Sequence, residues 1–146
     1  MRITKQTDYS LRILLYLASR PGQRVSSKQI AEAHNISLNH LHKIVSVLGE
    51  LGFLQVFRGA YGGLELQQDL KTVSIGAVMR AIDDKSSLVE CFNEETNTCV
   101  ISPACALKGA LKQAQEAFYQ SLDPLTLADV VKGGKAARLR ALTSDA

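Results

Sequence analysis

VSSKQIAEAHNISLNHLHKIVSVLGELGF, residues 25–53, encodes two short helices with a brief turn between them. Ser26 and Gln29 have the spacing of a capping box, which marks the start of a helix. Asn35 tolerates the left-handed conformation that a tight turn needs, and Ser37 then caps the second helix. Two helices joined in this way are typical of a helix-turn-helix.

The second helix of the pair separates apolar from polar residues. Its expected inward stripe consists of Leu38, Leu41, Val45 and Leu48. A recognition helix places its N-terminal turn in the major groove of DNA, where polar side chains reach base edges and phosphates. The candidate DNA-contacting residues are therefore Ser37, Asn39, His40 and Lys43. A helical hairpin with a solvated outer face would give the same pattern.

A predicted β-hairpin follows directly. FLQVF at 53–57 and LEL at 64–66 flank RGAYGG, whose three glycines permit positive φ angles. A hairpin in this place predicts a wing, in which Arg58 and Tyr61 are candidates to contact the DNA backbone or the minor groove. The wing favours DNA binding over the plain helical hairpin.

Charge is unevenly spread along the 146 residues. Residues 1–80 carry ten Lys/Arg and five Asp/Glu, a balance of +5, while residues 81–146 carry seven and nine, a balance of −2. This pattern favours a nucleic-acid-binding half joined to a regulatory half. The chain has no apolar run long enough for a membrane helix and no secretory leader pattern, so we expect a cytoplasmic protein that does not engage membranes.

The other apolar patterns complete a mainly α-helical fold with a small β-hairpin wing. DYSLRILLYLASR predicts a first helix, and residues 72–82 a further short one. A stripe along residues 103–122 predicts a long helix that needs a partner, for which a second copy of the chain is the natural candidate. The expected organisation is a winged helix-turn-helix domain at 1–82, a cysteine-bearing loop at 83–102, a dimerisation helix and short following helix at 103–133, and a disordered tail at 134–146.

All three cysteines lie within CFNEETNTCVISPAC, residues 91–105. Reducing conditions disfavour disulfides, and three thiols cannot pair fully within one chain. Thiolates are soft ligands for iron-sulfur clusters, zinc or copper(I), and this spacing is wider than zinc-finger knuckles use. Cys105 is expected in the first turn of a helix that begins at Pro103, where the helix dipole stabilises a thiolate. The segment predicts a metal centre held by Cys91, Cys99 and Cys105, with buried structural cysteines as the plainer interpretation.

Three sulfurs leave an iron-sulfur cluster one ligand short. Glu90, Glu94, Glu95, Asp8 and solvent all remain open as the source of the fourth ligand. Histidine is a poor local option, because none occurs after position 42.

Taken together, these motifs resemble the Rrf2 family of winged-helix transcription regulators over nearly the whole chain, and most closely its nitric-oxide-sensing repressors. The matching segments are TDYSLRILLYLA at 7–18, ISLNHLHKIV at 36–45, RGAYGGLEL at 58–66, ECFNEETNTC at 90–99, ISPACALKGAL at 101–111 and LADVV at 127–131.

The resemblance implies a homodimer whose long helices cross and whose cysteine loops carry an iron-sulfur cluster near the partner's first helix. In such repressors the cluster is often [4Fe-4S], with an aspartate of the other subunit as ligand, and Asp8 stands at the matching position. Lys108 replaces the histidine of the [2Fe-2S] type, so the resemblance favours [4Fe-4S] over [2Fe-2S]. Cys91 departs from the family pattern, because its seven-residue gap to Cys99 is longer than usual.

The implied function is that of a dimeric repressor that binds palindromic double-stranded operator DNA and releases it when nitric oxide attacks the cluster. The alternative on the same scaffold is a thiol-based, or iron- or oxygen-responsive, redox regulator. A small electron-transfer protein would not need a winged helix. No paired catalytic carboxylates, nucleophile elbow, Walker loop or GxGxxG turn is present, so an enzyme is not predicted.

Overall fold

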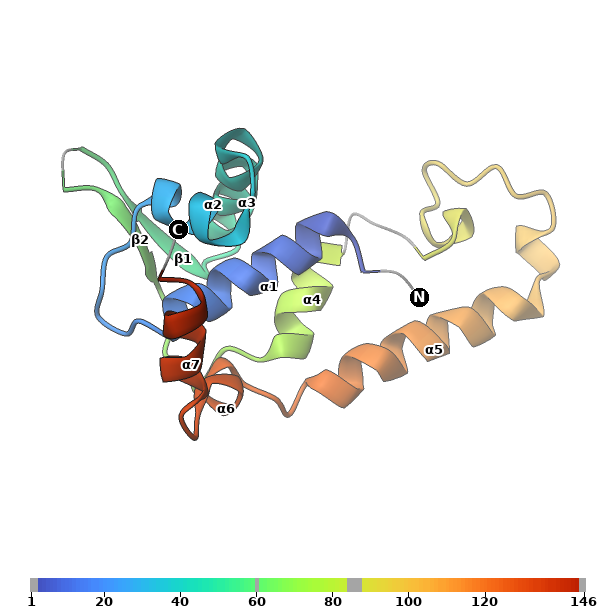
Figure 1. The fold of residues 1–146 in the computed structure, drawn as a ribbon. Helices are drawn as coiled ribbons and strands as arrows, with labels where there is room; N and C mark the ends of the chain where they lie inside the picture. Colours follow the sequence, from blue (N-terminus) through green and yellow to red (C-terminus); the bar gives the residue numbers. More distant parts are fainter. Residues whose placement is uncertain (1–2, 60, 84–87, 145–146) are drawn as a thin grey trace.

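The computed structural model describes residues 3–59, 61–83 and 88–144 (Figure 1). The predicted fold class is confirmed: the described chain is mainly helical and carries one antiparallel two-stranded hairpin. None of its helices has the length and apolar composition that crossing a membrane requires. The elements are α1 (Lys5–Ala18), α2 (Ser27–His34), α3 (Leu38–Glu50), β1 (Leu54–Phe57), β2 (Gly63–Leu66), α4 (Ile75–Asp83), the 3₁₀ turns η1 (Glu90–Phe92) and η2 (Ser102–Ala104), α5 (Ala106–Leu122), α6 (Leu127–Val131) and α7 (Lys135–Leu142).

Helices α2 and α3 form the predicted helix-turn-helix. Ser26 and Gln29 make both bonds of the capping box, with the Gln29 amide donating to Ser26 Oγ at 3.2 Å and the Ser26 amide donating to Gln29 Oε1 at 2.9 Å. Asn35 adopts the left-handed conformation, with φ 51°. The hydroxyl of Ser37 accepts the His40 amide at 3.4 Å and so caps α3.

The inward face of α3 differs from the predicted stripe at one position. Leu41, Val45 and Leu48 are buried as expected, but Leu38 is 43% exposed. Ile44 is buried instead. The apolar face of α3 is therefore rotated away from Leu38, the first residue of the helix.

The hairpin has the predicted position and is tied to the core. Its register pairs Leu54 with Leu66 and Val56 with Leu64, and both Leu54 and Leu64 are buried. Val25, just before α2, exchanges two backbone hydrogen bonds with Leu64, at 3.1 and 2.7 Å. The hairpin is therefore bonded on its inner edge to the segment that leads into the helix-turn-helix.

Helix α1 runs through the middle of the molecule and packs on α3, α4, α6 and the hairpin (Figure 1). Its residues Leu14 and Ala18 are buried, whereas Leu11 and Leu15 are half-buried at the edge of the apolar face. The apolar residues of α4 that face the core are all buried: Ile75, Val78, Met79 and Ile82.

Helix α5 extends from the rest of the fold as an arm that carries the cysteine segment at its N-terminal end (Figure 1). The prediction that it begins at Pro103 is wrong, because Ser102–Ala104 form a 3₁₀ turn and α5 begins at Ala106. Its predicted apolar stripe is largely uncovered within one chain. Leu107 is 63% exposed, and Ala110, Ala114 and Ala117 are also exposed.

The predicted disordered tail is instead a helix over most of its length. Helix α7 occupies Lys135–Leu142 and packs against α1 and α6. The Arg140 guanidinium donates to the carbonyl of Ser19 at the end of α1, and Arg20 donates to the Thr143 hydroxyl at 2.7 Å. These polar contacts dock a segment whose sequence has no strong apolar face. Residues 145–146 of that predicted tail lie outside the described part.

Candidate functional site

The candidate DNA-reading face is formed by the start of α3 and the tip of the hairpin. Ser37, Asn39 and Lys43 are exposed there, although the hydroxyl of Ser37 is already used as a helix cap. His40 is half-buried, because its ring meets the edge of Tyr9 on α1 with centroids 5.3 Å apart. The side chains at this turn are thus anchored to α1 at one position and open to solvent at the others.

The wing presents two exposed residues beyond the sheet. Arg58 follows β1 directly and is exposed, and Tyr61 is 90% exposed. Both predicted contact residues of the wing are therefore open to solvent.

The cysteine segment lies between α4 and α5. Cys91 belongs to η1, Cys99 to the loop that follows, and Cys105 is the N-cap residue of α5. All three are half-buried free thiols. Cys105 therefore lies beside the first-turn amides of α5, one position before the helix itself.

Asparagine side chains order the polar loop between the cysteines. Asn93 Oδ1 accepts the Glu95 amide at 3.0 Å, and Asn97 Oδ1 accepts the Cys99 amide at 3.0 Å. The carboxylate of Glu90 accepts from the hydroxyl of Thr98 at 3.2 Å, across eight residues of loop. These bonds give the loop a defined shape although few of its side chains are buried.

The predicted ligands do not converge within one chain. Among the described residues, no three His, Cys, Asp or Glu side chains are placed to hold a metal ion together. Asp8 lies in the first turn of α1 and forms a two-pronged ion pair with Arg12, at 3.0 and 2.7 Å. The donor set itself, three free thiols on one loop, suits an iron-sulfur cluster.

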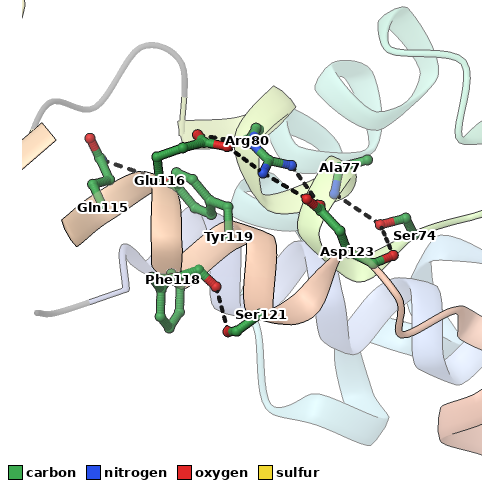
Figure 2. Close-up of polar contacts among 9 residues, drawn as sticks. All are labelled: Ser74, Ala77, Arg80, Gln115, Glu116, Phe118, Tyr119, Ser121 and Asp123. Atoms are coloured by element: carbon green, nitrogen blue, oxygen red, sulfur yellow. Dashed lines mark hydrogen bonds and ion pairs between the residues drawn. The ribbon is translucent and has the colours of Figure 1, made fainter. Parts of the chain in front are cut away.

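A polar clamp joins α5 to α4 (Figure 2). The guanidinium of Arg80 binds both oxygens of Asp123, at 2.6 and 2.8 Å, and both oxygens of Glu116, at 2.8 and 3.3 Å. These bonds to Arg80 hold the pKa of Asp123 and of Glu116 below their ordinary values. Ser74 Oγ donates to the Asp123 carbonyl at 3.0 Å.

The close approach of the two helices depends on Gly76. A Cβ atom at this position would lie 2.6 Å from the carbonyl oxygen of Tyr119 and 2.8 Å from the amide nitrogen of Asp123. Both of those atoms are backbone, so a side chain at 76 would force α5 outward. Sequence reasoning missed the clamp, because Gly76 and Arg80 sit in a short apolar helix and their partners lie about forty residues away.

A second polar chain leads from α5 to the first turn of α1. The Tyr119 hydroxyl donates to Asp83 at 3.1 Å, and the buried Thr7 hydroxyl donates to the other oxygen of Asp83 at 2.5 Å. Burial, with Asp83 nearby, raises the pKa of Tyr119. Thr7 is the neighbour of Asp8, so the long helix and the first turn of α1 are connected through one carboxylate.

A helix-turn-helix with a hairpin bonded to the segment before it defines a winged helix-turn-helix DNA-binding protein. The long helix that follows, preceded by a cysteine segment, is the additional feature of this chain. The chain belongs to the Rrf2 family of iron-dependent transcriptional regulators, which it matches over residues 3–133. It is therefore a transcriptional regulator that binds DNA, and it is not an enzyme.

Relatives of known name and structure agree with this placement. The chain is 47% identical over 132 residues to the HTH-type transcriptional regulator NsrR of Shouchella clausii, covering 90% of this chain and 89% of the relative. The structure resembles that of CymR, the global cysteine regulator of B. subtilis, with a TM-score of 0.67, 30% identity and coverage of 89% and 95%. It shares the fold of T. potens IscR, with a TM-score of 0.71, 23% identity and coverage of 94% and 91%.

Proposed function

We propose that this protein is a dimeric transcriptional repressor whose cysteine segment holds an iron-sulfur cluster and which releases operator DNA when nitric oxide attacks that cluster. The observation that carries the proposal is the placement of three free thiols on one loop at the N-terminus of α5. The similarity to NsrR over most of the chain, and the resemblance to nitric-oxide-sensing repressors, support the same signal.

Cys91, Cys99 and Cys105 would supply the sulfur ligands, and Asp8 of the partner subunit the fourth, oxygen ligand. A bound cluster would supply iron as the target for nitric oxide, and a carboxylate ligand, which is harder and more labile than a thiolate, would leave one iron open to it. Asp8 would exchange its ion pair with Arg12 for that role. Lys108 stands where the [2Fe-2S] type has its histidine ligand, so we favour [4Fe-4S] over [2Fe-2S].

The dimer is proposed from the uncovered face of α5. One exposed face of α5 carries Leu107, Ala110, Ala114 and Ala117, and the small side chains of the three alanines would let two copies of the helix approach closely. A symmetric pair would also bring two recognition helices to half-sites of a palindromic operator about one helical turn, roughly 34 Å, apart. Loss of the cluster would act through the loop on α5 and change that spacing.

On the DNA, Asn39 would read a base edge, since asparagine pairs well with adenine in the major groove. Lys43, His40 and Ser37 would bind nearby phosphates or bases. Arg58 and Tyr61 would follow the flanking backbone or the minor groove.

The decisive experiment follows the cluster and DNA binding together. Protein purified anaerobically is expected to be brown, to contain iron and sulfide, and to bind a palindromic duplex chosen by in vitro selection. Stepwise nitric oxide should change the absorption and EPR spectra and abolish binding in parallel. A colourless protein that takes up no iron or sulfide on reconstitution would overturn the cluster.

Ligand assignments are tested by single variants. Cys99→Ser and Asp8→Ala should lower the iron content or change the spectrum of the reconstituted protein. Glu94→Ala and Glu95→Ala are matched controls, because they remove exposed carboxylates from the same loop. An unchanged spectrum in Asp8→Ala beside a changed one in Glu94→Ala would move the fourth ligand to the loop.

A thiol switch is the second candidate, favoured by the half-buried free thiols and by the structural similarity to CymR, which has been crystallised from Staphylococcus aureus in an oxidized form. Oxidation would join two cysteines, with two electrons and two protons passing to an oxidant such as peroxide. Tight DNA binding by iron-free, reduced protein that is lost on peroxide treatment would favour this candidate.

A further inference from the structure

Arg24, in the loop before α2, contacts the wing through its side chain. The central carbon of its guanidinium lies over the ring of Phe57 on β1, 3.6 Å from the centroid. Its Nε donates to Glu65 on β2 at 2.9 Å, and a terminal nitrogen donates to the Tyr61 carbonyl at the tip at 3.3 Å. One side chain therefore touches both strands of the hairpin and its turn.

The hairpin approaches this loop too closely for a side chain to stand between them. A Cβ atom at Gly63 would lie 2.7 Å from Cγ of Arg24 and 2.9 Å from the carbonyl oxygen of Val25. The two backbone bonds between Val25 and Leu64 lie at the same place. The inner edge of β2 is thus fixed by Val25, while the outer part and the tip are held by Arg24.

The guanidinium of Arg24 already has partners within the protein. Its side chain is 40% exposed, yet it pairs with the carboxylate of Glu65 and stacks on an aromatic ring. Turning this guanidinium towards a phosphate would break its bond to Glu65 and its contact with Phe57.

We propose that Arg24 is a positioning residue for the wing, which sets where Arg58 and Tyr61 stand relative to α3 and does not itself contact DNA. The inference rests on the proposed contact between the wing and DNA. It assigns a role in operator binding to a residue that lies outside both the recognition helix and the wing.

A double-mutant cycle separates positioning from direct contact. The probe is the duplex selected with the wild-type protein under the same anaerobic conditions, followed by fluorescence anisotropy. Arg58→Met should weaken binding about tenfold, as for loss of one good DNA contact. Arg24→Met should cost a comparable factor in the wild type and clearly less in the Arg58→Met background, because the part of its effect that acts through Arg58 is already lost there.

Two further variants distinguish a positioning role of Arg24 from a direct contact between Arg24 and a phosphate. Arg24→Lys keeps the charge but lacks the planar fork, so it should bind nearly as weakly as Arg24→Met. Glu65→Gln removes a negative charge near DNA and would strengthen binding if Arg24 were freed to reach a phosphate; we expect it to weaken binding. Thermal unfolding followed by circular dichroism checks that each variant is folded.

The outcomes are distinct. Full additivity of Arg24→Met and Arg58→Met, or wild-type affinity in Arg24→Lys, overturns the positioning role and leaves the wing contact intact. Wild-type affinity in both Arg58→Met and Tyr61→Ala overturns the wing contact, and the role of Arg24 with it. A wild-type protein that selects no duplex overturns the proposed repressor itself.

Discussion

The crossing of α4 and α5 makes a sharp prediction for Gly76→Ala. In an open helix this change stabilises, because alanine is a better helix former than glycine by up to about 1 kcal/mol. Here the added Cβ would meet two backbone atoms of α5, at 2.6 and 2.8 Å, and these atoms move only if the helix moves. Overpacking of this kind costs about 1–3 kcal/mol.

The net expectation for Gly76→Ala is a loss of about 1–2 kcal/mol in the free energy of unfolding, which corresponds to a Tm lower by about 2–6 °C for a chain of this size. Gly109→Ala is the matched control. Gly109 lies in α5 with nothing within 4 Å of its would-be Cβ atom, so the same substitution there should raise the Tm or leave it unchanged.

Both variants are compared with wild type by thermal and urea unfolding at one fixed protein concentration, since the Tm of the proposed dimer would depend on concentration. A Gly76→Ala protein as stable as Gly109→Ala in both unfolding experiments would contradict this expectation. That result would mean that α5 moves away from α4 without loss, and the close crossing would not be a constraint on the fold.

Three other changes test separate parts of the structure. Ser26→Ala removes the capping box of α2 and should cost about 1 kcal/mol in urea unfolding, with Ser27→Ala as a neighbour that makes no capping bond. Burial lowers the pKa of His34, whose Nε2 is buried without a partner, so the folded state favours the neutral ring. Its stabilising contribution is present above the ordinary pKa of about 6.5 and is lost as the pH falls below it. Wild type should therefore lose more stability than His34→Phe between pH 7.5 and pH 5.5, and equal losses would contradict this account. Ala114→Glu puts a charge on the exposed face of α5 and should yield monomers in analytical ultracentrifugation, whereas Gln113→Glu, off that face, should not.

Local sequence signals predicted the DNA-binding half well. Helix α2 starts at the capping box of Ser26 and Gln29, and the turn after it is made by Asn35. The residues that determine both features are neighbours in the sequence, so a short stretch is enough to predict them. The exposure of Leu38 was not predicted, because it depends on how α3 is rotated against α1. The periodicity of apolar residues alone does not fix that rotation.

The regulatory half depends on partners that are distant in sequence. Arg80 and Gly76 look like ordinary residues of an apolar helix until α5 folds back onto them. Helix α7 was predicted as a tail because it docks through Arg140 and Thr143 onto the end of α1, and polar docking of this kind leaves no apolar period. The cysteines were recognisable from composition, but the described residues of one chain do not bring them together with Asp8.

The docking of α7 also bears on how the protein should be shortened for study. The family match ends at residue 133, and a chain cut there would look complete by that criterion. It would lose the bonds of Arg140 and Thr143 to Ser19 and Arg20, which hold the corner from which the chain runs on to Arg24 and the wing. A truncation at residue 133 leaves the DNA-binding half of the sequence intact but removes contacts that hold the end of α1 in place. The folded unit therefore extends at least ten residues past the family boundary.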